Sequence, residues 1–163
     1  MMRRAGWLAL LVVLGSCAQR GNTATATEAE GTRLIHERTM CFGPCPAFEF
    51  TWNGDGSALL KISKVFPDDE GAKLSPGHYF RDASTENRKA LMDILALSHS
   101  MNFEELGGTY DNPMIMDLPT IRTTIDGVEV VDRFEGPDLV LLYDAIENWI
   151  RTGKWTTQPT DNQ

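Results

Sequence analysis

The stretch AFEFTWNGDGSALLKIS, residues 47–63, predicts a β-hairpin and so sets the fold class. Every second residue of 48–52 is aromatic, which places three large rings on one face of a strand. Asn-Gly-Asp-Gly at 53–56 is a turn signal. Every second residue of 58–62 is apolar, so a return strand has its own buried face. We therefore expect two antiparallel strands that share one apolar side.

Further strands are expected on both sides of this hairpin. Residues 33–38 read as a first strand, and GHYFRD at 77–82 reads as a short edge strand. Residues 121–125 and 128–134 flank Asp126-Gly127, which predicts a second hairpin with a two-residue turn. Consecutive hairpins predict an antiparallel sheet, whose strand order the pattern does not fix.

Two one-sided helices complete the expected fold. Ser84 is a good N-cap for a helix that runs to about Ser100. Gly136 followed by Pro137 predicts the start of a second helix, with proline at its first position, and Gly153 ends it. Each helix has one apolar stripe, which must be buried against the sheet. The sequence thus predicts a two-layer α+β domain, with both helices packed on one face of an antiparallel sheet built from hairpins.

The start of the chain, MMRRAGWLALLVVLGSC, has the pattern of a secretory signal peptide. Its apolar run at 7–14 is too short to span a bilayer, which needs about 20 residues. Leu-Gly-Ser-Cys at 14–17 resembles the lipobox of bacterial lipoproteins. That resemblance implies that Cys17 is acylated, with chains such as palmitate, and becomes the mature N-terminus. Ala18, where retained lipoproteins have Asp, implies the periplasmic side of the outer membrane.

These signals divide the chain into four parts. Residues 1–16 are the expected signal peptide, 17–31 the acylated cysteine and a disordered tether, 32–155 a single domain, and 156–163 a disordered tail. As a flexible coil, residues 18–31 have a root-mean-square reach of about 20 Å. Loss of two signal-peptide arginines changes the net charge from 15 − 23 = −8 to 13 − 23 = −10. This acidic balance argues against nucleic-acid binding.

Cys41 and Cys45 form the one cysteine pair left once Cys17 is committed to lipid. Three roles fit two cysteines four positions apart: a structural disulfide, a thiol-redox pair, and a soft-metal site. An even count in an oxidising compartment favours the disulfide. Closing so small a loop stabilises the fold by only about 2 kcal/mol.

The motif Cys-Phe-Gly-x-Cys-Pro at 41–46, followed by aromatic alternation, a Gly-Asp-Gly turn and a return strand, resembles an uncharacterised bacterial lipoprotein domain family. The family is classed as a domain of unknown function. The similarity runs from about Thr32 to Ile150 and includes Tyr110 and Asp117-x-Pro119, although the family usually has tyrosine in place of Phe48. The resemblance implies the domain limits and a Cys41–Cys45 disulfide, and no activity.

Cys-x-x-x-Cys-Pro also resembles the copper-delivery proteins of cytochrome oxidase assembly. There two thiolates and a distant histidine bind copper on a thioredoxin-like fold, and thiolates do select Cu(I). That fold needs a βαβ crossover after the motif, whereas a hairpin follows here. Thiol-redox or Cu(I) chemistry at Cys41 and Cys45 therefore stays the alternative.

Other candidate residues are scattered. His36 shares a strand face with Leu34 and Arg38 and is either a satisfied histidine or part of a binding surface. Tyr110 and Asp117 belong to a polar loop that either bonds its own backbone or lines a site. Trp155 lies beyond the second helix and is a candidate contact residue, while Met114, Ile115 and Met116 are expected to cover the core.

No catalytic set and no metal-ligand set is legible in these residues. We therefore expect a lipid-anchored cell-envelope protein without a cofactor, and favour a non-enzymatic binding or structural module over an enzyme. The expected partners are the membrane, through the N-terminal lipid, and an envelope protein or small ligand.

Overall fold

A computed structural model describes residues 31–43, 45–64, 74–115 and 118–157 of the chain. The signal peptide, Cys17, the tether up to residue 30, and Asp117 lie outside these ranges, so the expectations for them stay predictions.

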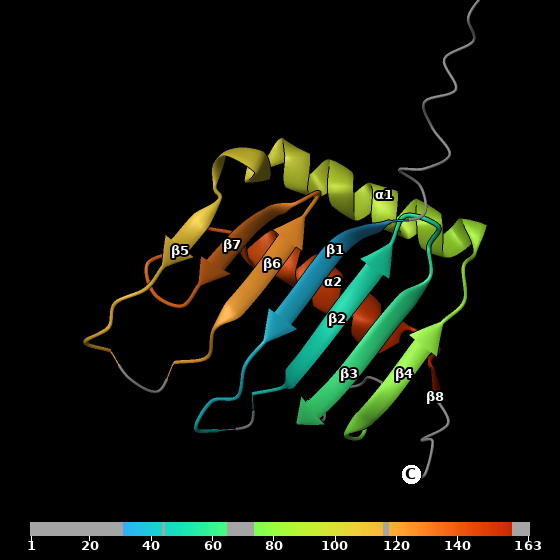
Figure 1. The fold of residues 1–163 in the computed structure, drawn as a ribbon, viewed down its shortest axis with the longest axis horizontal. Helices are drawn as coiled ribbons and strands as arrows, with labels where there is room; N and C mark the ends of the chain where they lie inside the picture. Colours follow the sequence, from blue (N-terminus) through green and yellow to red (C-terminus); the bar gives the residue numbers. More distant parts are fainter. Residues whose placement is uncertain (1–30, 44, 65–73, 116–117, 158–163) are drawn as a thin grey trace, which may run out of the picture.

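Eight strands of the described residues form one sheet (Figure 1), namely β1 (Thr32–Arg38), β2 (Ala47–Asn53), β3 (Ala58–Lys64), β4 (Gly77–Arg81), β5 (Gly108–Tyr110), β6 (Ile121–Ile125), β7 (Val128–Asp132) and β8 (Thr156–Thr157). Their order across the sheet is β5-β7-β6-β1-β2-β3-β4-β8. Neighbouring strands are antiparallel, except that β5 and β7 run parallel.

Both predicted hairpins are confirmed. Strands β2 and β3 pair with Phe50 opposite Leu60, and both side chains are buried. Strands β6 and β7 are joined by Asp126 and Gly127, which have positive φ angles of 48° and 87°. A two-residue turn with both φ angles positive matches the right-handed twist of the strands it joins. Strand β1 lies between the hairpins, paired with β2 and β6.

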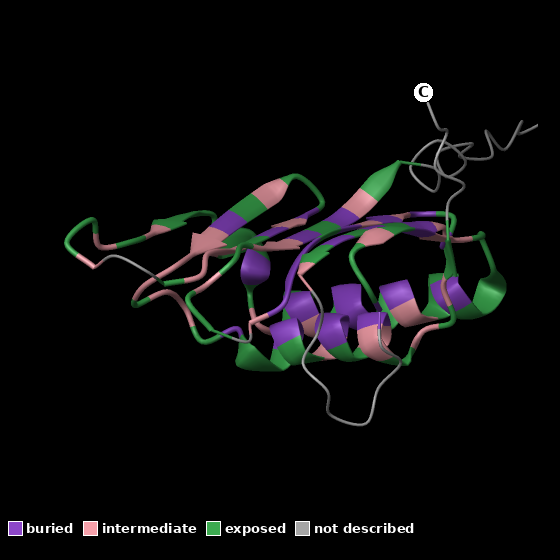
Figure 2. Ribbon diagram, turned by 90° about the horizontal axis from the view of Figure 1, so that it is seen from below, coloured by how far each residue is buried: buried purple, intermediate pink, exposed green. Residues whose placement is uncertain are grey.

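The helices α1 (Thr85–Ser100) and α2 (Val140–Thr152) pack on one face of the sheet, as Figure 2 shows, which confirms the predicted fold class. Ser84 caps α1 as predicted, because its side chain accepts a hydrogen bond of 3.0 Å from the backbone of Asn87. A 3₁₀ turn, η1 (Phe103–Glu105), follows α1. The apolar stripes of both helices meet the inner side chains of β1, β2, β3 and β7 in one core.

The start of α2 differs from the prediction. The helix begins at Val140, with Leu139 as its N-cap, and Pro137 precedes it. The chain first turns at Glu135, whose φ of 54° is left-handed, and Leu139 is then buried in the core. The first helical bond therefore runs from the Tyr143 amide to the Leu139 carbonyl, at 2.9 Å.

The sheet edges also differ from the prediction. Strand β4 is not at the edge, because Thr156 and Thr157, expected in the tail, pair with it as β8. Trp155 holds this segment in place: its indole donates a hydrogen bond of 2.8 Å to the Ile150 carbonyl and packs edge-on against Trp149. At the other edge, β5 was not predicted at all.

Candidate functional site

One face of the sheet lies opposite the helices and is open in the described structure (Figure 2). Successive side chains of a strand point to opposite faces of the sheet, so the alternation determines which side chains lie on this face. In β1, Leu34 and His36 point into the core, so Ile35 and Glu37 point outward. The same period leaves polar and half-exposed side chains along β2, β3, β4, β6 and β7. We call this surface the open face.

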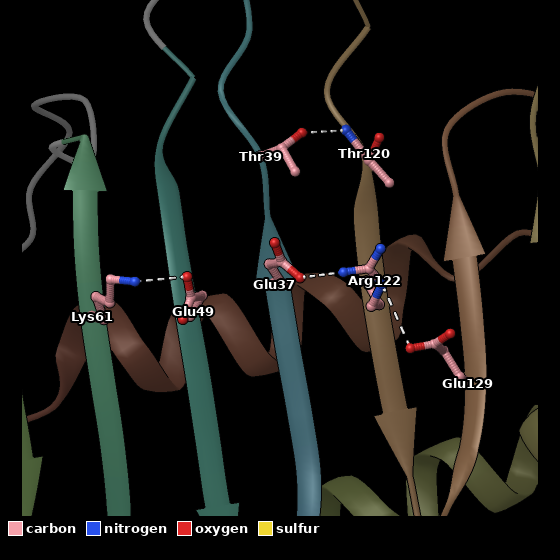
Figure 3. A network of polar contacts seen from close by, with 7 residues as sticks. All are labelled: Glu37, Thr39, Glu49, Lys61, Thr120, Arg122 and Glu129. Carbon is pink, nitrogen blue, oxygen red and sulfur yellow. Dashed lines mark hydrogen bonds and ion pairs between the residues drawn. The ribbon is translucent and has the colours of Figure 1, made fainter. Parts of the chain in front are cut away.

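Charged side chains form a ladder across the open face (Figure 3). Arg122 of β6 donates to Glu37 of β1 at 2.7 Å and lies 3.5 Å from Glu129 of β7. Lys61 of β3 donates to Glu49 of β2 at 3.0 Å. Exposed ion pairs of this kind stabilise a fold by about 0–1 kcal/mol each. The ladder therefore contributes little to the stability of the fold. Its paired charges are available for contact with a binding partner.

An apolar row runs beside the charged ladder. Ile35, Thr51, Leu59 and Phe80 are successive partners on β1, β2, β3 and β4. Ile35 is 39% exposed and Leu59 is 47% exposed, while Thr51 and Phe80 are half-buried. An apolar strip bordered by charges has the composition of a protein-binding surface, with its centre apolar and its rim polar.

A shallow pocket of about 200 Å³ opens where the ladder and the apolar row meet. Leu59 and Thr51 line it from the apolar row, and Glu49, Lys61 and His78 line it from the charged side. An apolar wall with a few convergent polar groups is the usual lining of a ligand-binding pocket. This volume is smaller than a typical small-molecule site, so it suits one side chain of a larger partner better.

A second group of polar residues is buried between the sheet and α2. His36 of β1 is fully buried, with its ring between those of Phe48 and Tyr143 at centroid distances of 5.7 and 5.5 Å. Its Nδ1 shares a hydrogen bond of 2.8 Å with the hydroxyl of Thr123 on β6. Its Nε2 lies 3.8 Å from Oε1 of Glu147 on α2, an ion-pair distance too long for a hydrogen bond.

Glu147 is the hub of this buried cluster. The residue is 4% exposed, and it sits on the buried face of α2 between core residues. Its Oε1 is 2.7 Å from Nη2 of Arg38 and its Oε2 accepts a hydrogen bond of 3.3 Å from Arg151. Both arginines reach toward solvent with part of their side chains. Glu147 thus joins β1 to α2 through two charge-assisted contacts.

Electrostatics favour a neutral His36 beside an ionised Glu147. Burial lowers the pKa of His36, and this outweighs the opposing effect of Glu147. Burial alone would raise the pKa of the Glu147 carboxyl, but His36, Arg38 and Arg151 together hold it below its ordinary value. Burial also raises the pKa of Tyr143, so its phenol stays protonated.

Thr123, His36 and Glu147 follow the hydroxyl–imidazole–carboxylate order of a catalytic triad. Thr123 and His36 are both 0% exposed, so a substrate cannot reach the hydroxyl in this structure. The geometry therefore supports a packing role, in which the cluster fixes α2 on the sheet.

The buried imidazole predicts a stability that falls on acidification. The ordinary pKa of histidine is 6.5, and that of folded His36 is lower, so below about pH 6.5 the unfolded chain binds a proton that the folded chain does not. We expect the free energy of unfolding to fall below this pH by up to about 1.4 kcal/mol per pH unit. Glu147, whose folded pKa is also lowered, adds a further loss below about pH 4.5. Urea unfolding between pH 7.5 and 4 measures both.

Single histidine variants separate His36 from the rest of the chain. His36→Gln should remove most of the slope between pH 6.5 and 5, whereas His78→Ala and His99→Ala, which remove exposed imidazoles, should keep it. A slope that persists in His36→Gln would show that other groups cause it.

The Cys41–Cys45 disulfide predicted from the sequence is confirmed, with the two Cα atoms 5.9 Å apart. It closes the connection between β1 and β2. Phe42, inside the ring, is 90% exposed. The ammonium of Lys64 donates a hydrogen bond to the carbonyl of Gly43, which brings a cation to the ring that the motif itself lacks.

The structure does not bring the four predicted surface residues together. His36 lies in the core rather than on the surface. Tyr110 is half-buried at the β5 edge and donates to the Leu106 carbonyl at 3.0 Å, while Trp155 lies by β8 at the opposite edge. Asp117 is outside the described residues. Their role in binding stays a prediction without a shared site.

Sequence reasoning missed Glu147 and the open face. A signal for Glu147 was present, because a glutamate at this point interrupts the apolar stripe of α2, while His36 and Arg38 share the inner face of β1. A carboxylate buried in the apolar stripe of a helix is costly unless it is paired, so a cation is expected on the strand that faces the helix. The open face could not be located before the strand order was known.

Two further properties concern the described residues alone. No group of three or more histidine, cysteine, aspartate or glutamate residues in them is arranged to hold a metal ion. Neither described helix has the length and apolar character that a bilayer crossing requires.

Comparison with known proteins identifies the family. A family model described as "Domain of unknown function (DUF6438)" matches residues 32–150. The chain belongs to this family. The match begins with β1 and ends inside α2, so the hairpins, the disulfide and the cluster residues His36, Thr123 and Glu147 lie within the DUF6438 domain, while Arg151 follows the matched residues. No curated protein and no solved structure matches the chain.

Proposed function

We propose that this DUF6438 protein is a lipid-anchored cell-envelope protein whose domain is a non-enzymatic binding module. Its open face is the binding surface, and its partner is another protein of the envelope. The anchor is Cys17, and the location is the periplasmic side of the outer membrane.

The observation that carries the binding role is the composition of the open face. On β1 to β4 the open face carries a row of three apolar side chains and one threonine, next to a ladder of paired charges. Apolar side chains left half-exposed on a sheet are a site for association, because covering them removes apolar surface from water. The paired charges of the ladder can form the polar rim of such an interface.

The disulfide supports the location. Structural disulfides persist in secreted and periplasmic proteins and are rare in the cytosol. The Cys41–Cys45 bond therefore fits export by the expected signal peptide.

The test asks whether the open face is covered in native envelopes. Leu59→Cys places the variant's only new thiol in the centre of the apolar row, with Cys41 and Cys45 disulfide-bonded. We expect this thiol to react with a maleimide several-fold more slowly in native envelopes than in the purified protein, because a bound partner shields it.

Met92→Cys is the matched control, because Met92 on α1 is 51% exposed and Leu59 is 47% exposed. Its thiol should react at the same rate in both preparations. If the Leu59→Cys thiol is equally reactive in envelopes and in purified protein, the open face is not a binding surface.

One observation favours the alternative, thiol-redox or Cu(I) chemistry. Lys64 places a cation against the Cys41–Cys45 ring, and a nearby cation lowers the pKa of a thiol and promotes the reactive thiolate. Equal alkylation rates of the reduced wild type and reduced Lys64→Met would remove this support.

A further inference from the structure

Two loops project from the same end of the sheet (Figure 1). One joins β1 to β2 and contains the disulfide, and the other joins β5 to β6. Their bases are joined by Thr39 and Thr120 (Figure 3). The Thr39 amide donates to the Thr120 carbonyl at 3.0 Å, and the Thr120 amide donates to the Thr39 hydroxyl at 2.8 Å. The described residues of the two loops, 39–43, 45–46, 111–115 and 118–120, therefore lie at one end of the sheet, and we call them the loop end.

The loop end exposes large apolar side chains. Phe42 is 90% exposed, Met114 is 87% exposed and Met40 is 67% exposed. Met114 was expected to cover the core and is exposed instead, Ile115 is half-buried, and Met116 lies outside the described residues.

The sequence has no charged residue at 40–46 or at 112–116. Asp111 and Asp117 flank the second of these segments, and the Lys64 ammonium bonds the Gly43 carbonyl, so charges lie beside the apolar side chains and not between them. An exposed aromatic ring and two exposed thioethers are costly to leave in water.

Local bonds hold these tips in place. The Cys41–Cys45 ring fixes the chain on both sides of Phe42, and Lys64 bonds the carbonyl of Gly43. On the other loop, the Met114 amide donates to the Asn112 side chain at 3.0 Å. A chain segment constrained by such local bonds loses less conformational freedom on binding, so its apolar area contributes more fully to association.

We propose that the loop end inserts into the surface of a lipid bilayer, with Phe42 and Met114 as the inserted side chains. This inference rests on the proposed lipid anchor, because the anchor keeps a bilayer within reach of the domain at all times. A permanent tether gives a high effective concentration, so a weak second contact becomes populated.

The length of the tether permits this contact. Thr32 begins β1 and the loop end follows its last residue, so the two are separated by the length of seven residues, about 23 Å. Residues 18–31 supply 14 residues, which span at most about 46–50 Å when fully extended. The loop end can thus face the bilayer that holds Cys17.

The chemistry of the loop end favours lipid over a protein partner. Insertion among acyl chains requires that the inserted side chains be uncharged, as Phe42 and Met114 are, whereas a protein interface tolerates charged contact residues. The charges beside them are paired or bonded: Asp111 is 3.3 Å from Arg133, and the Lys64 ammonium donates to the Gly43 carbonyl. The inserted side chains stand on separate loops, which suits a fluid surface that needs no fixed shape.

A fluorescence experiment on the lipidated full chain tests the proposal. Met114→Cys and Met92→Cys are each labelled with an NBD fluorophore and reconstituted by the native anchor into phosphatidylcholine vesicles containing a lipid with a spin label on its acyl chain. We expect the spin label to quench NBD at position 114 several-fold more strongly than NBD at position 92 on α1. Phe42→Asp in the Met114→Cys protein should reduce that quenching to the level of position 92, and Phe42 is exposed enough for the fold to tolerate the change.

The outcomes separate the contact from the anchor. Equal quenching at positions 114 and 92 in protein that floats with the vesicles would overturn the loop-end proposal and leave the anchor standing. Quenching at position 114 that Phe42→Asp leaves unchanged would overturn it as well. Protein that does not float with the vesicles would contradict the anchor itself and, with it, this proposal.

Discussion

Replacing Glu147 with alanine is expected to lower the free energy of unfolding by about 3 kcal/mol, at the lower end of the 3–5 kcal/mol typical of breaking a buried ion pair. Glu147 is 4% exposed and contacts Arg38, Arg151 and His36. Its loss removes the link between β1 and α2 and leaves two guanidinium groups beside an apolar layer. Because both arginines keep part of their side chains in water, the upper end of the range is not expected. Urea unfolding at pH 7 measures the change.

Glu129→Ala is the matched control for this variant. Glu129 also pairs with an arginine, Arg122, at 3.5 Å, but both side chains are about half-exposed on the open face. Its loss should change the free energy of unfolding by about 0–1 kcal/mol. If Glu147→Ala costs no more than Glu129→Ala, the buried cluster does not hold α2 on the sheet.

The sequence predicted the elements whose signals are local. The hairpin at 47–63 follows from strict alternation and a Gly-rich turn, and both strands formed as expected. Ser84 and the apolar stripe after it predicted α1, with its end at about Ser100. The Asp126-Gly127 turn predicted the second hairpin. In each case neighbouring residues decide the conformation, so no knowledge of the rest of the fold is needed.

The features that depend on distant residues could not be predicted. Strand β8 has two residues and no pattern of its own, and forms because Trp155 is fixed against α2. Strand β5 is three residues long and is ordered by its pairing with β7. Helix α2 begins at Val140, later than predicted, because Leu139 is buried in the core and the chain turns at Glu135.

The candidate site shows the same division. Cys41 and Cys45 are close in sequence, and their disulfide was predicted. The open face and the loop end are made by strands and loops far apart in the chain, such as the pair Thr39 and Thr120, and became visible only with the strand order. His36 was found in the sequence, but its burial depends on α2 and could not be read from β1 alone.

Replacing Cys17 with alanine is expected to abolish attachment of lipid to the protein. Acylation acts on a thiol, and Cys17 is the thiol at the end of the expected lipobox. Each buried CH₂ of an acyl chain contributes about 0.8 kcal/mol to membrane binding, so several chains attach a protein stably to the bilayer. Loss of all the chains is therefore expected to abolish this attachment. The proposed location and the contact of the loop end with lipid both depend on this attachment.

Incorporation of an alkyne-tagged fatty acid by growing cells tests the anchor most directly. We predict that the wild type takes up the tag at a mature N-terminus formed by Cys17, and that Cys17→Ala takes up none. The Cys41→Ser/Cys45→Ser variant, which lacks the disulfide and keeps Cys17, should be tagged like the wild type. A wild-type protein without the tag, or a Cys17→Ala protein that still carries it, would contradict the lipid anchor and the function proposed from it.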